Sequence, residues 1–254
     1  MSPRPAKNRA GRQTVERLLD AAERLVATNG PQVPLRQITQ AAGQQNNSAI
    51  AYHFGSRQGL LDAVWERRTQ RVNGERTALL AAMAADGSID DLRALLEVHV
   101  LPMTNEIGAH LPSYWARFNE VTLAQMPLAF LESFDDDLAQ RVGQEVPLRT
   151  LADVFHRMCT LISDGSEVDA SLRVALMVRF VVAGLAGWER DQEVGLVAGD
   201  SLAPFAHGLV ELAYGMLVNP SPAMRDAAPA LHASRSARER LRPPRSPRSR
   251  PPRP

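Results

Sequence analysis

The spacing of apolar residues is the feature that most constrains how this chain can fold. From Thr14 to Val218, apolar side chains recur three or four residues apart, which is the period of an α-helix with one buried face. The first such segment has them at Val15, Leu18, Leu19, Ala22, Leu25 and Val26. No stretch shows the sustained alternation of apolar and polar residues that a half-buried strand requires. The spacing therefore predicts an all-α fold.

Start and stop signals divide the first third of the chain into three short helices and one long one. The first helix is expected to begin at Thr14 and to end at Asn29-Gly30-Pro31, because glycine permits a left-handed cap and proline cannot continue a helix. The second and third are expected over 35–42 and 47–53, separated by a tight turn at Gly43. Ser56 is predicted to cap the fourth helix, which runs to about Ala85.

The helical pattern continues through the rest of the chain until its composition changes. The expected helices lie over 89–101, 113–126, 131–163, 170–190 and 201–218. The prolines expected to end or kink helices are Pro102, Pro112, Pro127 and Pro147. From Asn219 onward, arginine, serine and proline dominate, and half of the 18 prolines fall in the last 36 residues. We therefore expect a disordered tail over 219–254 and a disordered basic arm over 1–12.

The net charge of +1 conceals three regions of different sign. Residues 1–58 carry eight basic and three acidic residues, residues 59–218 carry 12 and 23, and residues 219–254 carry nine and two. A basic head, an acidic body and a basic tail predict an anion-binding module attached to a self-contained acidic domain.

Several classes of protein are disfavoured by composition. The chain is 44% hydrophobic and 22% charged, as is typical of a globular protein, and no uninterrupted apolar run approaches the ~18 residues of a membrane span. A secretory signal has an apolar segment after its charged start, and the N-terminus of this chain has none. The single cysteine, Cys159, excludes an intrachain disulfide and a paired-cysteine metal site. We expect a cytoplasmic protein without membrane association.

The second and third predicted helices, joined by a tight turn, form a helix-turn-helix pattern. The strings that carry it are LRQITQAAG over 35–43, SAIAYHFGSR over 48–57 and LLDAV over 60–64. This sequence resembles the N-terminal domain of the tetracycline-repressor (TetR) family over about residues 12–66, and the resemblance does not extend to the body. It implies a helix-turn-helix DNA-binding domain over 13–58 and a helical regulatory and dimerisation domain over 59–218.

Short polar side chains at the start of the third helix suit the approach to base edges, and flanking donors suit phosphates. The candidate DNA-binding residues are Arg36, Asn46, Asn47, Ser48, Ala49, Tyr52, His53 and Arg57. For Arg36 and Arg57, a role in contacting DNA is implied by the resemblance. Tyr52 and His53 could instead be structural, whereas Ile50 and Phe54 are expected in the core. The chain departs from the family pattern by an extra residue in the turn and by Ala51 in place of an aromatic residue.

One recognition helix offers little contact surface, and dimers solve this by placing two such helices about 34–36 Å apart on a palindromic operator. The last two helices carry wide apolar faces suited to a homodimer interface. The candidate residues are Phe180, Gly184, Trp188, Leu209, Leu212 and Met216. The alternative is that these residues form an internal core, and the dimer role follows from the resemblance.

The middle helices carry large apolar side chains with a few polar groups between them, as the walls of ligand pockets do. The candidate pocket residues are Trp115, Phe118, Thr122, Met126, Phe155, Met158 and Cys159, for a largely apolar small-molecule effector. The alternative is again a simple core. The histidines lack metal-ligand spacing, and no catalytic motif is present, so we expect no metal, no cofactor and no enzyme activity.

These features together predict a transcriptional repressor that an effector releases from double-stranded DNA by binding one of two conformations more tightly. The alternative is a ligand-independent activator or a low-specificity DNA-binding protein that uses its basic tail.

Overall fold

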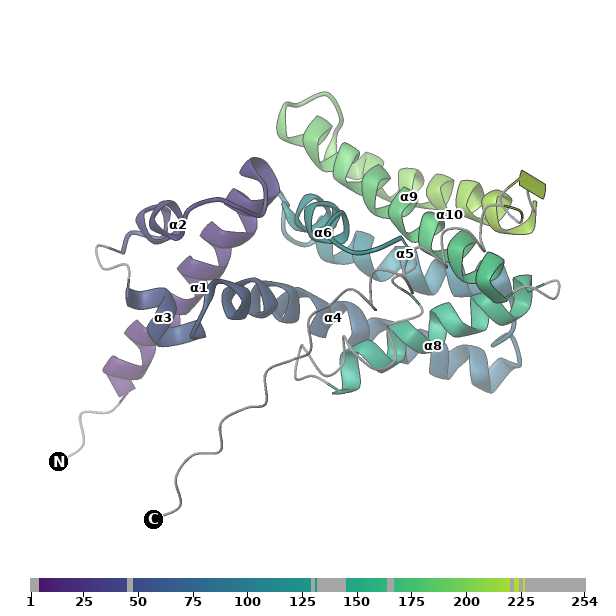
Figure 1. The fold of residues 1–254 in the computed structure, drawn as a ribbon, viewed down its shortest axis with the longest axis horizontal. Helices are drawn as coiled ribbons and strands as arrows, with labels where there is room; N and C mark the ends of the chain where they lie inside the picture. The colour runs from purple at the N-terminus through teal and green to yellow at the C-terminus, as the bar shows by residue number, and fades with distance from the viewer. Residues whose placement is uncertain are drawn as a thin grey trace, which may run out of the picture.

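The computed structural model of the protein describes residues 5–44, 48–128, 131, 145–163, 167–219, 222, 223 and 226 (Figure 1). All regular secondary structure in these residues is helical, which confirms the predicted all-α class. The helices are α1 (Pro5–Asn29), α2 (Leu35–Ala41), α3 (Ser48–Phe54), α4 (Arg57–Asp86), α5 (Leu92–Gly108), α6 (Trp115–Leu123), α8 (Glu145–Ile162), α9 (Glu167–Glu193) and α10 (Leu202–Val218), with a short 3-10 turn at Gly199–Ser201.

Most predicted helices are present, and the N-terminal arm is the clearest difference. Residues 5–12 are the first turns of α1, whereas the sequence analysis expected an irregular arm over 1–12. Proline suits the first turn of a helix, and residues 6–12 include two alanines, two arginines and a lysine, which are good helix formers. The predicted tail over 219–254 lies almost entirely outside the described residues.

The fourth helix begins as its sequence predicts. Ser56 is the N-cap, and its hydroxyl oxygen accepts a hydrogen bond from the backbone N–H of Gly59 at 3.0 Å. The helix ends at Gly87, which adopts a left-handed conformation with φ of 81°. Because α4 is 30 residues long, it extends from the N-terminal helices into the rest of the molecule (Figure 1).

Pro102 lies inside α5, although a proline ordinarily ends or kinks a helix. A proline at this position leaves the carbonyl of Val98 without its helical donor. The guanidinium of Arg76, from α4, donates to the carbonyls of Val98 at 3.4 Å and His99 at 3.2 Å. Arg76 is only 3% exposed, and burial lowers its pKa to about 10. The long-range contact therefore supplies the carbonyl of Val98 with a donor in place of the one that the proline lacks.

The helices form two groups, one toward each end of α4. At one end lie α1, α2 and α3, with Leu18, Ile38, Ile50 and Leu60 no more than 1% exposed between them and the start of α4. At the other end α5, α6, α8, α9 and α10 surround a second set of buried side chains (Figure 1). We call the first group the head and the second the body.

The start of α6 is capped by a side chain from another helix. The carboxylate of Glu189, on α9, accepts hydrogen bonds from the backbone N–H groups of Ala116 and Arg117, both at 3.0 Å. Glu189 is 1% exposed, and burial raises its pKa, while these hydrogen bonds act in the opposite direction. A negative charge at a helix N-terminus is favourable, so this contact fixes α6 against α9.

Two helical segments in the described part of the chain are long and apolar enough to cross a membrane. They are Asp169–Glu193 and Gly199–Val218, with 61% and 33% of their most apolar windows buried inside the protein. The core helix of a soluble protein passes the same test, so two such segments are weak evidence for a span. The sequence criterion of an uninterrupted apolar run had excluded both.

Candidate nucleic-acid interface

The α2–turn–α3 unit lies at the end of the molecule farthest from α9 and α10 (Figure 1). Gly43 follows α2 with φ of +70°, a conformation that side-chain-bearing residues rarely adopt, and the chain then turns toward α3. Ile38 of α2 and Ile50 of α3 are both buried, at 0% and 1% exposure. Each short helix is thus anchored by a fully buried isoleucine, with Leu35, Ala49 and Phe54 packed against the core beside it.

The outward face of α3 carries a small polar residue and an aromatic one. Ser48 and Ala51 are exposed, and the side chain of Tyr52 is 84% exposed. The rings of Tyr52 and His53 meet edge to face with centroids 4.8 Å apart. An exposed tyrosine on a helix held by a buried isoleucine is available to an external partner.

The other candidate DNA-binding residues divide into two groups. Arg36 lies exposed on α2, while Ala49 is half-buried and packs against the core. Asn46 and Asn47 lie outside the described residues. Arg57 is half-buried at the start of α4, and its guanidinium donates to the carbonyl oxygens of Pro31 and Val33. Arg57 therefore ties α4 to the loop between α1 and α2, a structural role that the resemblance did not indicate.

The core predictions for this region agree with the structure. Ile50 is fully buried, and Phe54 is partly buried and packs against the core. Gly59, one turn into α4, lies against the end of α3. A Cβ added at this position would come within 2.1 Å of the carbonyl oxygen of Phe54. The close approach explains why glycine stands here, and it holds α3 at a fixed position on α4.

Most of the candidate pocket residues lie in the core of the body. Trp115 and Phe118 are 3% and 0% exposed and stack with centroids 5.9 Å apart, and Phe155 and Met158 are equally buried. Thr122 and Met126 are half-buried, and the Thr122 hydroxyl donates to the carbonyl of Phe118. Burial raises the pKa of the Cys159 thiol to about 11. This arrangement matches the alternative that the sequence left open, a packed core.

The candidate dimer residues are only partly at the surface. Trp188 and Leu209 are each 4% exposed, and the indole N–H of Trp188 donates to the Ser201 hydroxyl at 3.0 Å. A Cβ at Gly184 would lie 2.8 Å from a methyl carbon of Leu209, so this glycine lets α9 and α10 approach within one subunit. These three positions therefore belong to the internal core.

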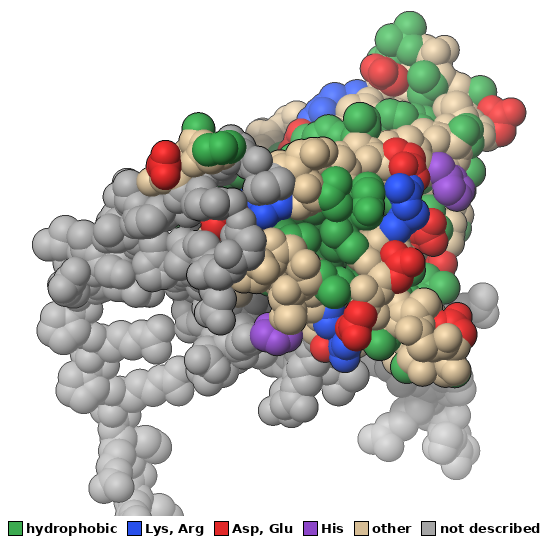
Figure 2. All heavy atoms as spheres, turned by 90° about the vertical axis from the view of Figure 1, so that its right-hand side faces the viewer, with side chains coloured by type: hydrophobic (Ala, Val, Ile, Leu, Met, Phe, Trp, Pro, Cys, Tyr) green, Lys and Arg blue, Asp and Glu red, His purple; other side chains and the backbone are tan. Residues whose placement is uncertain are grey.

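Leu212 and Met216 remain on the surface, at 60% and 40% exposure, and Phe180 is half-buried. Figure 2 views the end of the body that is remote from the head. Among the side chains coloured there, hydrophobic groups gather in the middle, with acidic and basic groups around them.

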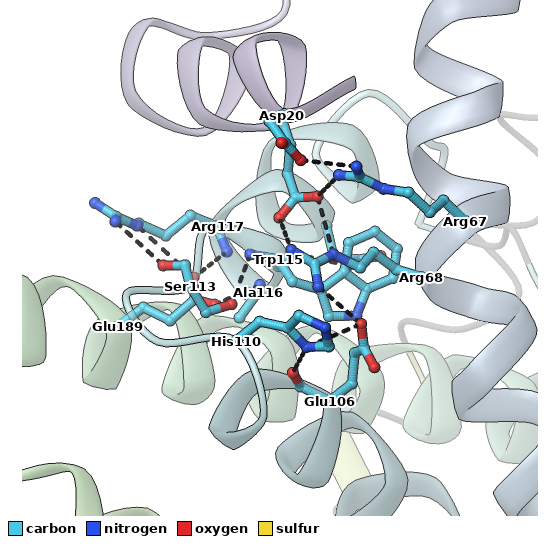
Figure 3. Close-up of polar contacts among 12 residues, drawn as sticks. Asp20, Arg67, Arg68, Glu106, His110, Ser113, Trp115, Ala116, Arg117 and Glu189 are labelled. Atoms are coloured by element: carbon cyan, nitrogen blue, oxygen red, sulfur yellow. Dashed lines mark hydrogen bonds and ion pairs between the residues drawn. The ribbon is translucent and has the colours of Figure 1, made fainter. Parts of the chain in front are cut away.

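Sequence reasoning missed a network of charged side chains that joins head and body (Figure 3). Arg67 and Arg68 of α4 both bind Glu23 of α1 at 2.9 Å, and Arg68 also binds Glu106 of α5 at 2.8 Å. Glu23 and Glu106 are 3% and 6% exposed. The residues come from three separate helices, so no spacing in the sequence indicates that they meet.

Comparison with known proteins does not assign a role to these residues. No protein-family model matches the chain, and no curated protein matches its sequence. The function proposed below therefore depends on the chain's own residues and their arrangement.

Proposed function

We propose that this protein is a cytoplasmic, homodimeric regulator of transcription, of the TetR type, that binds a palindromic site in double-stranded DNA. In its simplest form it is a repressor that a small-molecule effector releases. Residues 13–58 form the DNA-binding unit, with α2 and α3 as the helix-turn-helix, and residues 59–218 form the regulatory and dimerisation domain. It is proposed to act without catalysis.

The outward face of α3 is the observation that carries the proposal. A recognition helix must expose small polar groups and hydrogen-bond donors while its other face is held rigidly. Ser48 and the 84%-exposed Tyr52 meet the first requirement, and the 1%-exposed Ile50 meets the second. Arg36 on α2 adds an exposed cation suited to a phosphate. At 84% exposure, Tyr52 takes little part in the protein's own packing beyond its edge contact with the His53 ring.

The exposed stripe of α10 supports pairing of two copies. Phe205, Leu212 and Met216 are 37%, 60% and 40% exposed, and they lie seven and four residues apart along one helix. Residues seven and eleven apart fall on one face, so an isologous contact of this face with a second copy would bury all three from both sides. Such a dimer would present two α3 helices to DNA.

Binding to the DNA upstream of the protein's own gene, against scrambled DNA of equal composition, tests the proposal. Wild type is expected to prefer the native fragment across a salt series. Tyr52→Ala and Arg36→Ala each remove a contact worth about 1–3 kcal/mol, so each is expected to weaken that binding about 5- to 150-fold. Arg157→Ala, which removes a half-buried charge from α8 in the body, is the control and is expected to leave binding unchanged. Equal binding by all four proteins would contradict the proposal.

The charge of the tail favours one alternative, a low-specificity DNA-binding protein or ligand-independent activator. Residues 219–254 carry nine basic and two acidic residues, enough to attract phosphates without reading sequence. A chain ending at Val218 separates the two functions. Retained preference for the native fragment supports the specific regulator, whereas loss of all binding together with a steep salt dependence of the full chain supports the alternative.

A further inference from the structure

A shallow cavity of about 550 Å³, largely open to solvent, lies where the head meets the body. Its walls come from α1 and α2 on one side and from α4 and the segment Pro112–Tyr114 on the other. This volume is in the range of small-molecule sites. The cavity is distinct from the core region that the sequence suggested as a pocket, and none of those residues lines it.

The acidic groups of this cavity already form ion pairs with arginines of the protein. Both carboxylate oxygens of Glu23 accept hydrogen bonds from Arg68, and one of them also accepts from Arg67. Asp20 accepts from Arg67 at 2.7 Å (Figure 3). Arg68 in turn donates to Glu106. Both carboxylates that line the cavity are therefore held in ion pairs, Glu23 as a buried group and Asp20 as one that is 67% exposed.

Two further arginines line the cavity and form no ion pair with these carboxylates. Arg17 and Arg24 lie seven residues apart on α1, which places them on one face of that helix. Both are exposed, and in the described part of the chain neither guanidinium makes a hydrogen bond or ion pair with another residue. Arg24 lies within electrostatic range of Glu193, but that carboxylate accepts hydrogen bonds from Arg117 at 2.7 Å and Tyr114 at 2.9 Å. The cavity thus presents two cations that lack a bonded anion.

The other side chains that line the cavity are small or largely apolar. Ala21, Ala42 and Pro112 line the cavity, together with Tyr114. The phenol of Tyr114 is held at its hydroxyl by Glu193 and at one ring face by the guanidinium of Arg117, 4.6 Å from the ring centroid. A fixed aromatic ring beside two arginines suits a ligand with a flat apolar part and an anionic group.

We propose that this cavity is a binding site for a small aromatic carboxylate, with the carboxylate on Arg17 and Arg24 and the ring against Pro112 and Tyr114. The occupied site connects α1 and α2 to the body. If the proposed function holds, such a ligand shifts DNA affinity, because its affinity differs between arrangements of head and body. Binding itself requires no DNA and stands independently of that function.

Calorimetric titration of the DNA-free full-length protein tests the site, with benzoate as the probe and benzamide as its uncharged counterpart. Benzoate is expected to bind at least tenfold more tightly than benzamide, since charge-assisted hydrogen bonds are the stronger ones. The double variant Arg17→Gln/Arg24→Gln is expected to lose that advantage. Arg12→Gln, which removes one positive charge from α1 outside the cavity, is expected to retain it.

The proposal is overturned if benzoate does not bind, if benzamide binds equally well, or if Arg12→Gln is as defective as the double variant. A second titration separates the site from the proposed function. Benzoate binding that survives in a protein with no DNA preference would leave the site intact and refute the regulator. DNA preference without benzoate binding would refute the site and leave the proposed regulator intact.

Discussion

Replacing Glu23 with glutamine tests the charged network that joins α1 to α4. Glu23 is 3% exposed, and its carboxylate accepts three hydrogen bonds, at 2.9, 3.0 and 2.9 Å, from the guanidiniums of Arg67 and Arg68. The side chains of these arginines are only 16% and 11% exposed. Glutamine keeps the shape but removes the charge, so it leaves two poorly solvated cations without this partner.

The expected loss follows from burial. Breaking a buried ion pair by removing one partner costs about 3–5 kcal/mol, because the remaining charge stays desolvated. Glu16 provides a matched control, since it binds the same Arg67 at 3.1 Å but its side chain is 61% exposed. An exposed pair contributes at most about 1 kcal/mol. Glu23→Gln should therefore lower the free energy of unfolding several times more than Glu16→Gln.

Urea denaturation followed by far-ultraviolet circular dichroism measures both free energies at pH 7. Glu23→Leu combined with Arg68→Met should recover part of the loss, because apolar replacements of a buried pair are often tolerated. Equal effects of Glu23→Gln and Glu16→Gln would refute the reasoning, since burial would then make no difference to the strength of the pair.

Two further predictions concern acid stability and the attachment of α3. Burial, reinforced by the nearby Arg76 charge, lowers the pKa of His99 from 6.5 to about 3, so the unfolded chain takes up the proton first. The free energy of unfolding should therefore fall as the pH drops below 6.5, and protonation of His99 in the unfolded chain should account for about 2 kcal/mol of that loss by pH 5. In His99→Phe, urea midpoints should lack this part of the pH dependence. An unchanged pH dependence in the variant would contradict the assignment. Gly59→Ala should lower the melting temperature, because its Cβ meets the Phe54 carbonyl oxygen at 2.1 Å, whereas Gly74→Ala, with nothing within 4 Å in the same helix, should stabilise by up to about 1 kcal/mol. Shifts of the same sign for both would contradict the proposed close contact.

Local signals predicted the helices well because those signals act within a few residues. Ser56 was identified as the cap of α4 from its position before an apolar run, and its hydroxyl does accept the Gly59 N–H. Ile50 was placed in the core from helical spacing alone, and it is 1% exposed. Where a residue distant in the sequence decides whether a helix continues, local signals do not predict it. Pro102 lies inside α5, and Arg76, 26 positions earlier, supplies a donor to the carbonyl of Val98 that the proline leaves free.

The same reasoning explains what the sequence could not show about the site. The apolar stripe of α10 is evident from its spacing, but only packing separates Leu209, which is 4% exposed, from Leu212, which is 60% exposed. Arg57 looks like a phosphate contact in the motif and yet donates to Pro31 and Val33. The cavity between head and body is lined by residues from four separate parts of the chain, so no motif or apolar period in the sequence predicts it.

Site-specific photocrosslinking tests most directly the claim that the outward face of α3 contacts DNA. A benzophenone amino acid would replace Tyr52 on α3 in one protein and Leu212 on α10 in another; both positions are exposed, at 84% and 60%. In the presence of the preferred fragment, position 52 should crosslink to DNA and position 212 to a second protein copy. Crosslinks to DNA from position 212 with none from position 52 would contradict the account.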